Sequence, residues 1–350
     1  MTTTETSTEP ATMSTIVVTG PGTVDEIHET RPEVGASDVL LDVKACGICG
    51  SDAMYTAVGG IPPRQGATPL GHEPAGVVVA VGADVEGIAV GDHVVVNPMA
   101  ASDGIIGSGG AQGGLSEQLL IRGAKLDVHL KVIPDDVPWA VAALNEPMAV
   151  ARHAVNRSGA KAGQKAVVFG AGPIGLGAAI SMKLRGVEHV VVVDVVPSRL
   201  ETALAVGADA VINSAEEDVT ARLLELHGTA PRSFVRGDRP DTDVYLDAAG
   251  AAPVIATIAE SAKHGATATV VGVHKKPVEL DLGALLTTEL TLTLSMGYPT
   301  EIFEVTEDLV NHWERFAHLV SHQIPRADAL HALELAATPG AAEKVVVVFE

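Results

Sequence analysis

Cysteine, aromatic residues and long apolar runs are all scarce in this chain. Its 350 residues include only two cysteines, Cys46 and Cys49, and aromatic residues make up 3% of the total. Two cysteines exclude a secreted disulfide framework and indicate a reducing, cytoplasmic setting. No stretch approaches the roughly 18 uninterrupted apolar residues of a membrane-spanning helix, and residues 1–5 lack the basic and apolar regions of a signal peptide.

Basic residues are also few. The chain carries 23 Lys and Arg against 44 Asp and Glu, a formal net charge of -21. A charge of this sign argues against polyanionic partners. We therefore expect neither nucleic acid nor an anionic membrane as a partner.

The apolar residues that are present indicate a parallel α/β fold. They make up 47% of the chain and are mostly Val, Ala, Leu and Ile, as in parallel sheets buried on both faces. The length favours two domains. Residues 14–96 contain short Val-rich strands between Gly, Pro and Asp, which predicts a small barrel or sandwich. Residues 1–13 are predicted to be a disordered tail, because the first 12 or so are rich in Thr, Glu, Ser and Pro.

From Lys165 onward, strands alternate with helices in the pattern of a parallel sheet. The sequence predicts strands over 166–169, 189–193, 210–212, 244–246 and 269–271, a strictly alternating strand over 289–295 and a final strand over 344–349. It predicts helices over 173–185, 198–206 and 302–320. A capping box at 214–217 predicts the start of another helix.

A glycine-rich turn between the first of these strands and the following helix predicts a dinucleotide site. Its residues are Gly170, Gly172, Pro173, Ile174 and Gly175. Such glycines let the backbone approach a pyrophosphate at the amino end of a helix.

An acidic residue follows at the position that this motif requires. Asp194 ends the next strand, about 20 residues after the turn, where a carboxylate accepts hydrogen bonds from ribose hydroxyls. It would repel a 2′-phosphate, which favours NAD over NADP. Arg199 either flanks the adenosine or is an ordinary surface residue.

A second constellation has the chemistry of a divalent-metal site. Cys49, His72, Glu73 and Glu146 offer one thiolate, one imidazole and two carboxylates, a set suited to a catalytic zinc with an open position. A thioredoxin-like Cys46–Cys49 pair would lie beside a βαβ unit, and this pair lies in a β-rich region. A zinc knuckle would need a second Cys or His pair, and the chain contains no further cysteine. We therefore predict that Cys49 is a ligand and Cys46 a small buried thiol.

These motifs, taken together, resemble those of the zinc-dependent medium-chain alcohol dehydrogenases. The matching stretches occur in the family's order from about residue 14 to the end. The Glu-Pro dipeptide at 146–147 resembles the one found in the branch of sorbitol, threonine and butanediol dehydrogenases. The stretches are residues 47–52, 71–76, 91–92, 146–147, 170–175 and 343–346.

The resemblance implies an α/β architecture. A Rossmann doubly wound parallel sheet over 154–297 would bind NAD, and a β-rich GroES-like catalytic domain would comprise 14–153 and 298–350. It implies a homodimer or homotetramer, paired through the strand at 289–295.

The resemblance also implies roles for single residues. Cys49 and His72 would be zinc ligands, and Glu73, slightly ahead of Glu146, would complete the site. Ser51 would relay a proton. Gly272, Val273 and Ser295 would contact the nicotinamide.

The sequence departs from the family at two places. The four-cysteine lobe that holds a structural zinc in many relatives is replaced by a short glycine-rich stretch within 97–114, so we expect one catalytic zinc and no structural zinc. Met54 stands where relatives often carry a relay histidine.

The implied activity is hydride transfer between NAD and a secondary alcohol, diol or polyol. The alternatives are a carbonyl reductase working mainly in the reductive direction, a zinc-free quinone or enone reductase, and a catalytically silent binding protein of the same fold. The retained metal ligands and Asp194 argue against the last two.

Overall fold

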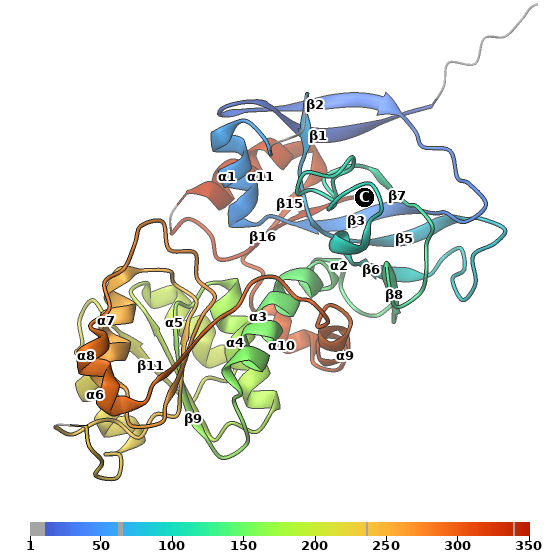
Figure 1. Ribbon diagram of the computed structural model, residues 1–350. Helices are drawn as coiled ribbons and strands as arrows, with labels where there is room; N and C mark the ends of the chain where they lie inside the picture. Colours follow the sequence, from blue (N-terminus) through green and yellow to red (C-terminus); the bar gives the residue numbers. More distant parts are fainter. Residues whose placement is uncertain (1–10, 62–65, 236, 339) are drawn as a thin grey trace, which may run out of the picture. The chain divides into compact units, whose positions relative to one another are not determined.

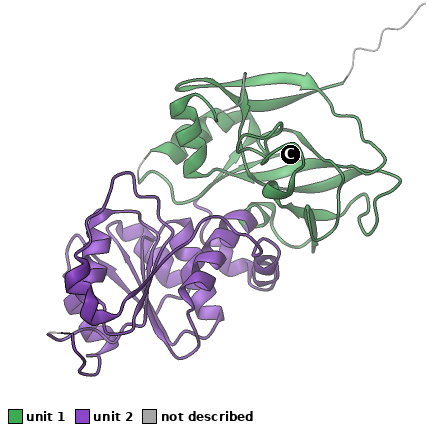
Figure 2. Ribbon diagram, viewed as in Figure 1, with its two compact units in different colours: residues 1–144, 322–350 green, residues 145–321 purple. Residues whose placement is uncertain are grey.

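The chain builds two units, one of them from both ends of the sequence. The computed structural model describes residues 11–61, 66–235, 237–338 and 340–350. Unit 1 comprises Met1–Leu144 and His322–Glu350, and unit 2 comprises Asn145–Ser321 (Figure 2). Residues 145–153 and 298–321, which the sequence places with the catalytic domain, thus belong to unit 2. Helix α3 (Asn145–Ser158) packs there against α4 (Pro173–Leu184) and α9 (Glu304–Asn311), which explains the difference.

Unit 1 is mainly antiparallel (Figure 1). Its strands are β1 (Thr12–Gly20), β2 (Thr23–Thr30), β3 (Val39–Gly47), β4 (Thr68–Pro69), β5 (Glu73–Val81), β6 (His93–Val96), β7 (Gln118–Ile121), β8 (Leu130–Ile133), β15 (His322–Pro325) and β16 (Val345–Val348). Its helices are α1 (Gly50–Val58), α2 (Trp139–Ala142) and α11 (Ala329–Ala337), with single 3-10 turns at Pro98–Ala100 and Arg326–Asp328.

Strand β3 organises the larger sheet of unit 1. That sheet runs β15-β16-β3-β5-β6-β8, with β7 also paired to β3, while β2-β1-β4 form a second sheet. At the carboxyl end of β3, Gly47 pairs with Glu73 of β5 on one side and with Val346 of β16 on the other. Three distant parts of the sequence therefore meet at Gly47.

Unit 2 is a parallel sheet with helices. Its strands are β9 (Lys165–Phe169), β10 (His189–Asp194), β11 (Ala210–Asn213), β12 (Val244–Asp247), β13 (Thr267–Val270) and β14 (Thr291–Leu294). Besides α3, α4 and α9, its helices are α5 (Pro197–Ala205), α6 (Val219–His227), α7 (Ala252–Ser261), α8 (Leu282–Leu285) and α10 (Trp313–Ala317), with a 3-10 turn at Leu286–Thr288.

The strand order of unit 2 is β11-β10-β9-β12-β13-β14, and every neighbouring pair is parallel. This confirms the doubly wound Rossmann sheet that the sequence predicts. The apolar runs explain it, because Val190 to Val193 are all buried and therefore face apolar neighbours on both sides of the sheet. The chain switches sides of the sheet between β9 and β12, and ligands bind at such switch points.

Several predicted elements differ from the structure. The prediction of a capping box at 214–217 is wrong. Helix α6 begins at Val219, and its N-cap is Asp218, whose side chain accepts a hydrogen bond from Ala221 N at 2.8 Å. The helix predicted over 302–320 is divided into α9 and α10 at His312, whose backbone angles are not helical. Helices α1 and α11 and strand β15 were not predicted.

The amino-terminal region is ordered from an earlier residue than the sequence suggests. Strand β1 begins at Thr12, inside the stretch predicted to be disordered, and residues 1–10 lie outside the described residues. Among the helices that the structure describes, none is both long and apolar enough to cross a bilayer.

Candidate metal and nucleotide sites

Three of the four predicted metal ligands come together in unit 1. The ligand atoms of Cys49, His72 and Glu73 all lie within 4.8 Å of one another. Cys49 is the N-cap of α1, so its side chain lies at the positive end of the helix dipole, which stabilises an anionic ligand. Glu73 is the first residue of β5 and His72 directly precedes it, and both are buried.

Asp52 ties the Cys49 turn to the His72 turn. Its fully buried carboxylate accepts hydrogen bonds from Cys49 N at 2.9 Å and from Gly71 N at 3.3 Å. One of its oxygens lies 3.7 Å from His72 Nδ1. Such a carboxylate fixes the orientation of a ligating imidazole. The predicted relay residue Ser51 also lies in this cluster, with Oγ 3.5 Å from His72 Nε2.

The surroundings of Glu73 show whether this cluster fits a cation. One carboxylate oxygen, Oε2, forms a buried ion pair with Lys344 Nζ, and Lys344 also donates to Ile48 O at 2.9 Å. The other oxygen, Oε1, is buried and has no hydrogen-bond partner among the described residues. A buried carboxylate oxygen without a partner is costly. Since one carboxylate oxygen of Glu73 lies within 4.8 Å of ligand atoms of Cys49 and His72, and this buried carboxylate has an oxygen without a partner among the described residues, the donor set fits a divalent metal.

Gly47 makes the position of Glu73 sterically feasible. A Cβ atom at Gly47 would overlap the Glu73 carboxylate and approach Lys344 Cε to 3.0 Å. The absence of a side chain at this position thus leaves room for the buried ion pair.

The glycine-rich stretch that replaces the four-cysteine lobe supports the His72 turn. Gly114 N donates to Gly71 O at 2.6 Å. Gly71 has φ of +87°, and a Cβ there would approach Leu115 N to 2.7 Å. A Cβ at Gly107 would overlap Gly71 O. This stretch therefore packs closely against the turn that carries the candidate ligand His72.

The prediction for Cys46 is confirmed. Its side chain is fully buried, and burial, reinforced by the nearby charges of Asp52 and Glu73, raises the pKa of its thiol far above the usual range. A thiol in such surroundings is inert.

Two further residues that the sequence analysis singles out lie on helices. Glu146 belongs to unit 2, near the amino end of α3, and stays a predicted ligand. Met54 lies on α1 and is 53% exposed.

The predicted nucleotide turn has the expected local structure in unit 2. Strand β9 leads into Gly170, which has φ of +97°, and α4 begins at Pro173 with Gly172 as its N-cap. A Cβ at Gly175 would overlap Gly170 O, whereas nothing lies within 4 Å of a Cβ at Gly172. The turn is thus tightly closed on the helix side and open at Gly172, as backbone contact with a pyrophosphate requires.

Asp194 faces this turn. Its carboxylate accepts hydrogen bonds from Ala171 N at 2.7 Å, Val195 N at 2.7 Å and Val196 N at 2.9 Å. The acid is therefore held against the glycine turn, which agrees with its predicted role. Arg199 lies on α5, and its contact with nucleotide stays a prediction.

The predicted nicotinamide residues follow the last two strands of the same sheet. Gly272 and Val273 follow β13, and Ser295 follows β14. Ser295 N donates to Val270 O at 3.0 Å, so Ser295 lies beside the carboxyl end of β13. Its Oγ is buried and has no partner in the part of the chain that the structure describes.

Comparison with known proteins identifies the family. Residues 35–129 match the model of the alcohol dehydrogenase GroES-like domain, and residues 173–312 match that of zinc-binding dehydrogenases. The (R,R)-butanediol dehydrogenase of Neisseria gonorrhoeae is 33% identical over 79% of this chain and 81% of that protein. The sorbitol dehydrogenase of Bos taurus is 31% identical over 91% of each chain.

A solved structure shows the same fold. The crystal structure of 2R,3R-butanediol dehydrogenase from Bacillus subtilis matches with a TM-score of 0.83 and 27% identity, over 96% of this chain and 99% of that one. These similarities agree with the metal and nucleotide features of the two units. The chain is a member of the zinc-dependent medium-chain alcohol dehydrogenase family, and its activity is that of an oxidoreductase.

Proposed function

We propose that the protein transfers a hydride between NAD and a secondary alcohol, diol or polyol, with one catalytic zinc. Unit 1 would supply the metal site and unit 2 the nucleotide site. The observation that carries the proposal is the cluster of Cys49, His72 and Glu73, in which the buried Glu73 carboxylate keeps one oxygen without a partner among the described residues. Two of its relatives are a butanediol dehydrogenase and a sorbitol dehydrogenase, which supports this class of substrate.

The residues of unit 1 define what the metal site would do. Cys49, His72 and Glu73 would hold zinc, which supplies a Lewis acid that stabilises negative charge on the substrate oxygen. Asp52 holds the two ligand turns together. Ser51 would hydrogen-bond the substrate hydroxyl and accept its proton while passing its own proton to a ribose hydroxyl of the cofactor, and from there to water. Glu146 stays the alternative to Glu73 as a ligand.

The preference for NAD rests on Asp194. A carboxylate held against the pyrophosphate turn accepts hydrogen bonds from ribose hydroxyls and repels a 2′-phosphate. Arg199, Gly272, Val273 and Ser295 would complete the cofactor contacts.

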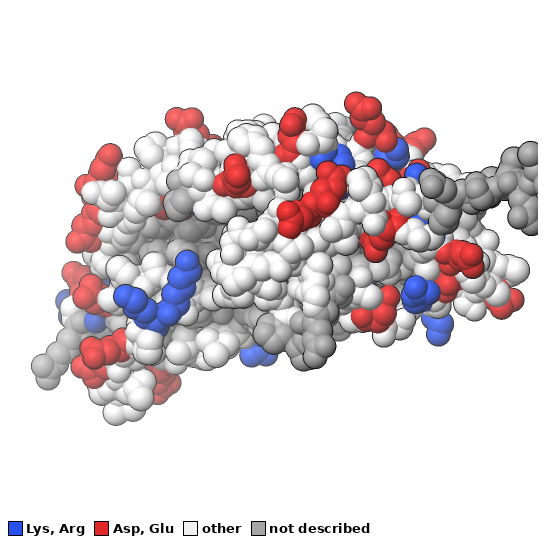
Figure 3. All heavy atoms as spheres, turned by 90° about the horizontal axis from the view of Figure 1, so that it is seen from above, with Lys and Arg blue, Asp and Glu red and all other residues white. Residues whose placement is uncertain are grey.

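The absence of a structural zinc stays a prediction, supported by the sequence. The two cysteines of the chain are Cys46 and Cys49, so the stretch 97–114 contains no cysteine that could bind a structural zinc. The charge of -21 favours a small, uncharged substrate over a polyanion. Figure 3 shows acidic side chains spread over much of one face. A cytoplasmic setting also stays a prediction from the cysteine content.

The proposed reaction is tested by NADH formation with a panel of secondary alcohols, diols and polyols, each repeated with NADP. We expect turnover with at least one member of the panel and a clear preference for NAD. If no alcohol is oxidised, and the corresponding ketones are not reduced, by protein that carries one zinc per chain, the proposed substrate class is wrong.

We further propose a homodimer or homotetramer that pairs through β14. This strand ends the sheet of unit 2, so one side of it lacks a partner strand among the described residues. Leu292 and Leu294 on β14 are exposed, as are Leu282 and Leu286 just before it. An unprotected apolar edge of this kind favours pairing with a second copy.

The assembly is tested by light scattering after gel filtration at micromolar concentration. Wild type should elute as a dimer or tetramer, and Leu294→Lys should shift the protein toward monomer. An exclusively monomeric wild type would contradict this part of the proposal.

A further inference from the structure

A buried acid links two loops at the carboxyl edge of the sheet of unit 2. Asp247, the last residue of β12, is fully buried. Its Oδ1 accepts hydrogen bonds from Ala249 N and Gly250 N, both at 2.9 Å. Its Oδ2 accepts one from His274 Nε2 at 2.7 Å. His274 lies in the loop that follows β13, so this contact joins that loop to the turn after β12.

The backbone of the two loops is also closely packed. Asp247 O accepts hydrogen bonds from Val271 N and Gly272 N, both at 2.9 Å. Gly250 has φ of +64°, and a Cβ there would approach Val273 O to 2.6 Å. A Cβ at Gly272 would in turn overlap Gly250 N. The turn at 248–250 and the loop at 271–274 thus form one layer.

The same layer contacts the nucleotide turn. A Cβ at Gly170 would approach Ala249 N to 3.0 Å, and Ala248 N donates to Phe169 O at 2.8 Å. The layer therefore lies directly beside the pyrophosphate turn, on the β12 side of the switch point.

Its place in the sheet indicates which half of the cofactor it meets. Asp194 lies on the β10 side of the switch point, where it would bind the adenosine ribose. A dinucleotide crosses the switch point, so its nicotinamide half must extend over β12, β13 and β14. The buried, partnerless Oγ of Ser295 follows β14 and lies on that side.

We propose that His274, through its hydrogen bond to Asp247, is a positioning residue that holds the loop at 271–274 in place for the nicotinamide half of the cofactor. The proposal rests on the proposed NAD-linked function. His274 supplies the side-chain hydrogen bond between the loop and the buried acid, whereas the other donors to Asp247 are backbone amides. Loss of that bond removes the side-chain anchor of the loop next to Val273 and leaves the backbone hydrogen bonds of Val271 and Gly272 to Asp247 O, while Asp194 and the Gly170 turn are untouched.

The test compares two ligands on His274→Ala and wild type. NADH contains the nicotinamide, whereas ADP-ribose shares everything but that ring. We expect His274→Ala to bind NADH about tenfold more weakly, the effect of losing one hydrogen bond to a carboxylate. Its ADP-ribose affinity should stay within twofold of wild type. His274→Gln retains a donor and should recover part of the NADH affinity.

His264→Ala is the matched control. His264 precedes β13 at the opposite end of the strand, and its side chain is 39% exposed, with Nε2 3.7 Å from Glu289 and Nδ1 3.4 Å from Thr287 O. Its removal should change neither affinity.

The outcomes separate the two proposals. Unchanged NADH binding in His274→Ala, or an equal loss for both ligands, would overturn the positioning role. If wild type binds neither NADH nor ADP-ribose, the proposed cofactor itself is wrong.

Discussion

Lys344 forms a buried ion pair with Glu73, although 271 residues separate them in the sequence. The ammonium group pairs with one carboxylate oxygen, and the other oxygen is buried without a partner among the described residues. Lys344 also holds the Ile48 carbonyl, next to Cys49 in the chain. One lysine thus contacts the backbone beside one ligand and the side chain of another.

Replacing Lys344 should destabilise the metal-free protein more than the zinc-loaded protein. In Lys344→Met the buried Glu73 charge loses its partner, which costs about 3 kcal/mol of unfolding free energy when no metal compensates it. The measurement is denaturant unfolding of both forms. Lys44→Met, which removes an exposed contact to Glu350 O, should have little effect on either. Equal destabilisation of the two forms by Lys344→Met would contradict the compensation by metal.

Neutralising the two candidate carboxylates should show which one binds zinc directly. Glu73→Gln should weaken zinc binding at least about tenfold, because it removes an anionic ligand from the buried cluster. Glu146→Gln should weaken it less. Competition with a chromophoric chelator measures both affinities. A larger loss for Glu146→Gln would make Glu146 the direct ligand.

The charge of Asp194 should determine the choice between NAD and NADP. Asp194→Asn keeps an acceptor oxygen for Ala171 N but removes the repulsion of a 2′-phosphate. The ratio of kcat/KM for NADP to that for NAD should rise at least about tenfold. Asp209→Asn, at an ion pair with Lys183, serves as a control and should leave the ratio unchanged. An unchanged ratio in Asp194→Asn would remove the physical basis for NAD specificity.

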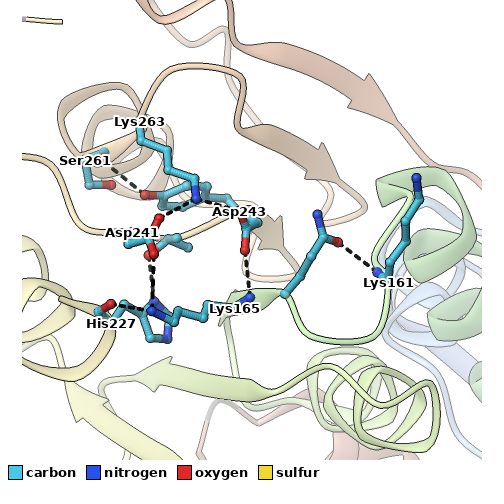
Figure 4. Close-up of polar contacts among 10 residues, drawn as sticks. Lys161, Lys165, His227, Asp241, Asp243, Ser261 and Lys263 are labelled. Carbon is cyan, nitrogen blue, oxygen red and sulfur yellow. Dashed lines mark hydrogen bonds and ion pairs between the residues drawn. The ribbon is translucent and has the colours of Figure 1, made fainter. Parts of the chain in front are cut away.

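The buried histidine His227, which lies beside Lys165 at the amino end of β9 in unit 2, should make the unfolding free energy depend on pH. His227 Nδ1 lies 2.7 Å from Thr242 Oγ1, and Nε2 lies 3.1 Å from His189 Nδ1. Figure 4 shows His227 beside the ion pairs that Lys165 and Lys263 form with Asp241 and Asp243. Burial, followed by the charges of His189 and Lys165, lowers the pKa of His227 from 6.5 to about 4.

Since the unfolded chain binds this proton more readily, the unfolding free energy should fall as pH drops from about 6.5 to about 4. It should not fall further on account of this group at lower pH. The pKa difference sets an upper bound of about 3 kcal/mol. Denaturant unfolding at several pH values checks this, with His227→Gln expected to flatten that part of the profile. A slope that persists in the variant would assign the effect to other groups.

The features that depend on local sequence could be predicted from it. The glycine turn, α4 and Asp194 lie within about 25 residues, and strand, turn and helix signals agree there. The roles of Lys344 and of the Asp247–His274 pair could not be predicted, because each depends on which strands become neighbours. The prediction of a capping box at 214–217 was wrong because Asp218 is the N-cap of the helix that follows. The sequence indicated no packing role for the glycine-rich stretch within 97–114, yet Gly107 and Gly114 pack against Gly71.

The most direct test of the metal site uses cobalt(II) in chelator-stripped protein. A thiolate ligand gives cobalt a strong near-ultraviolet charge-transfer band. The account predicts one cobalt per chain, a band that Cys49→Ser abolishes and Cys46→Ser leaves intact, and NADH formation that returns with the metal. A band that survives Cys49→Ser, or disappears in folded Cys46→Ser protein, would contradict the assignment of Cys49 as the thiolate ligand.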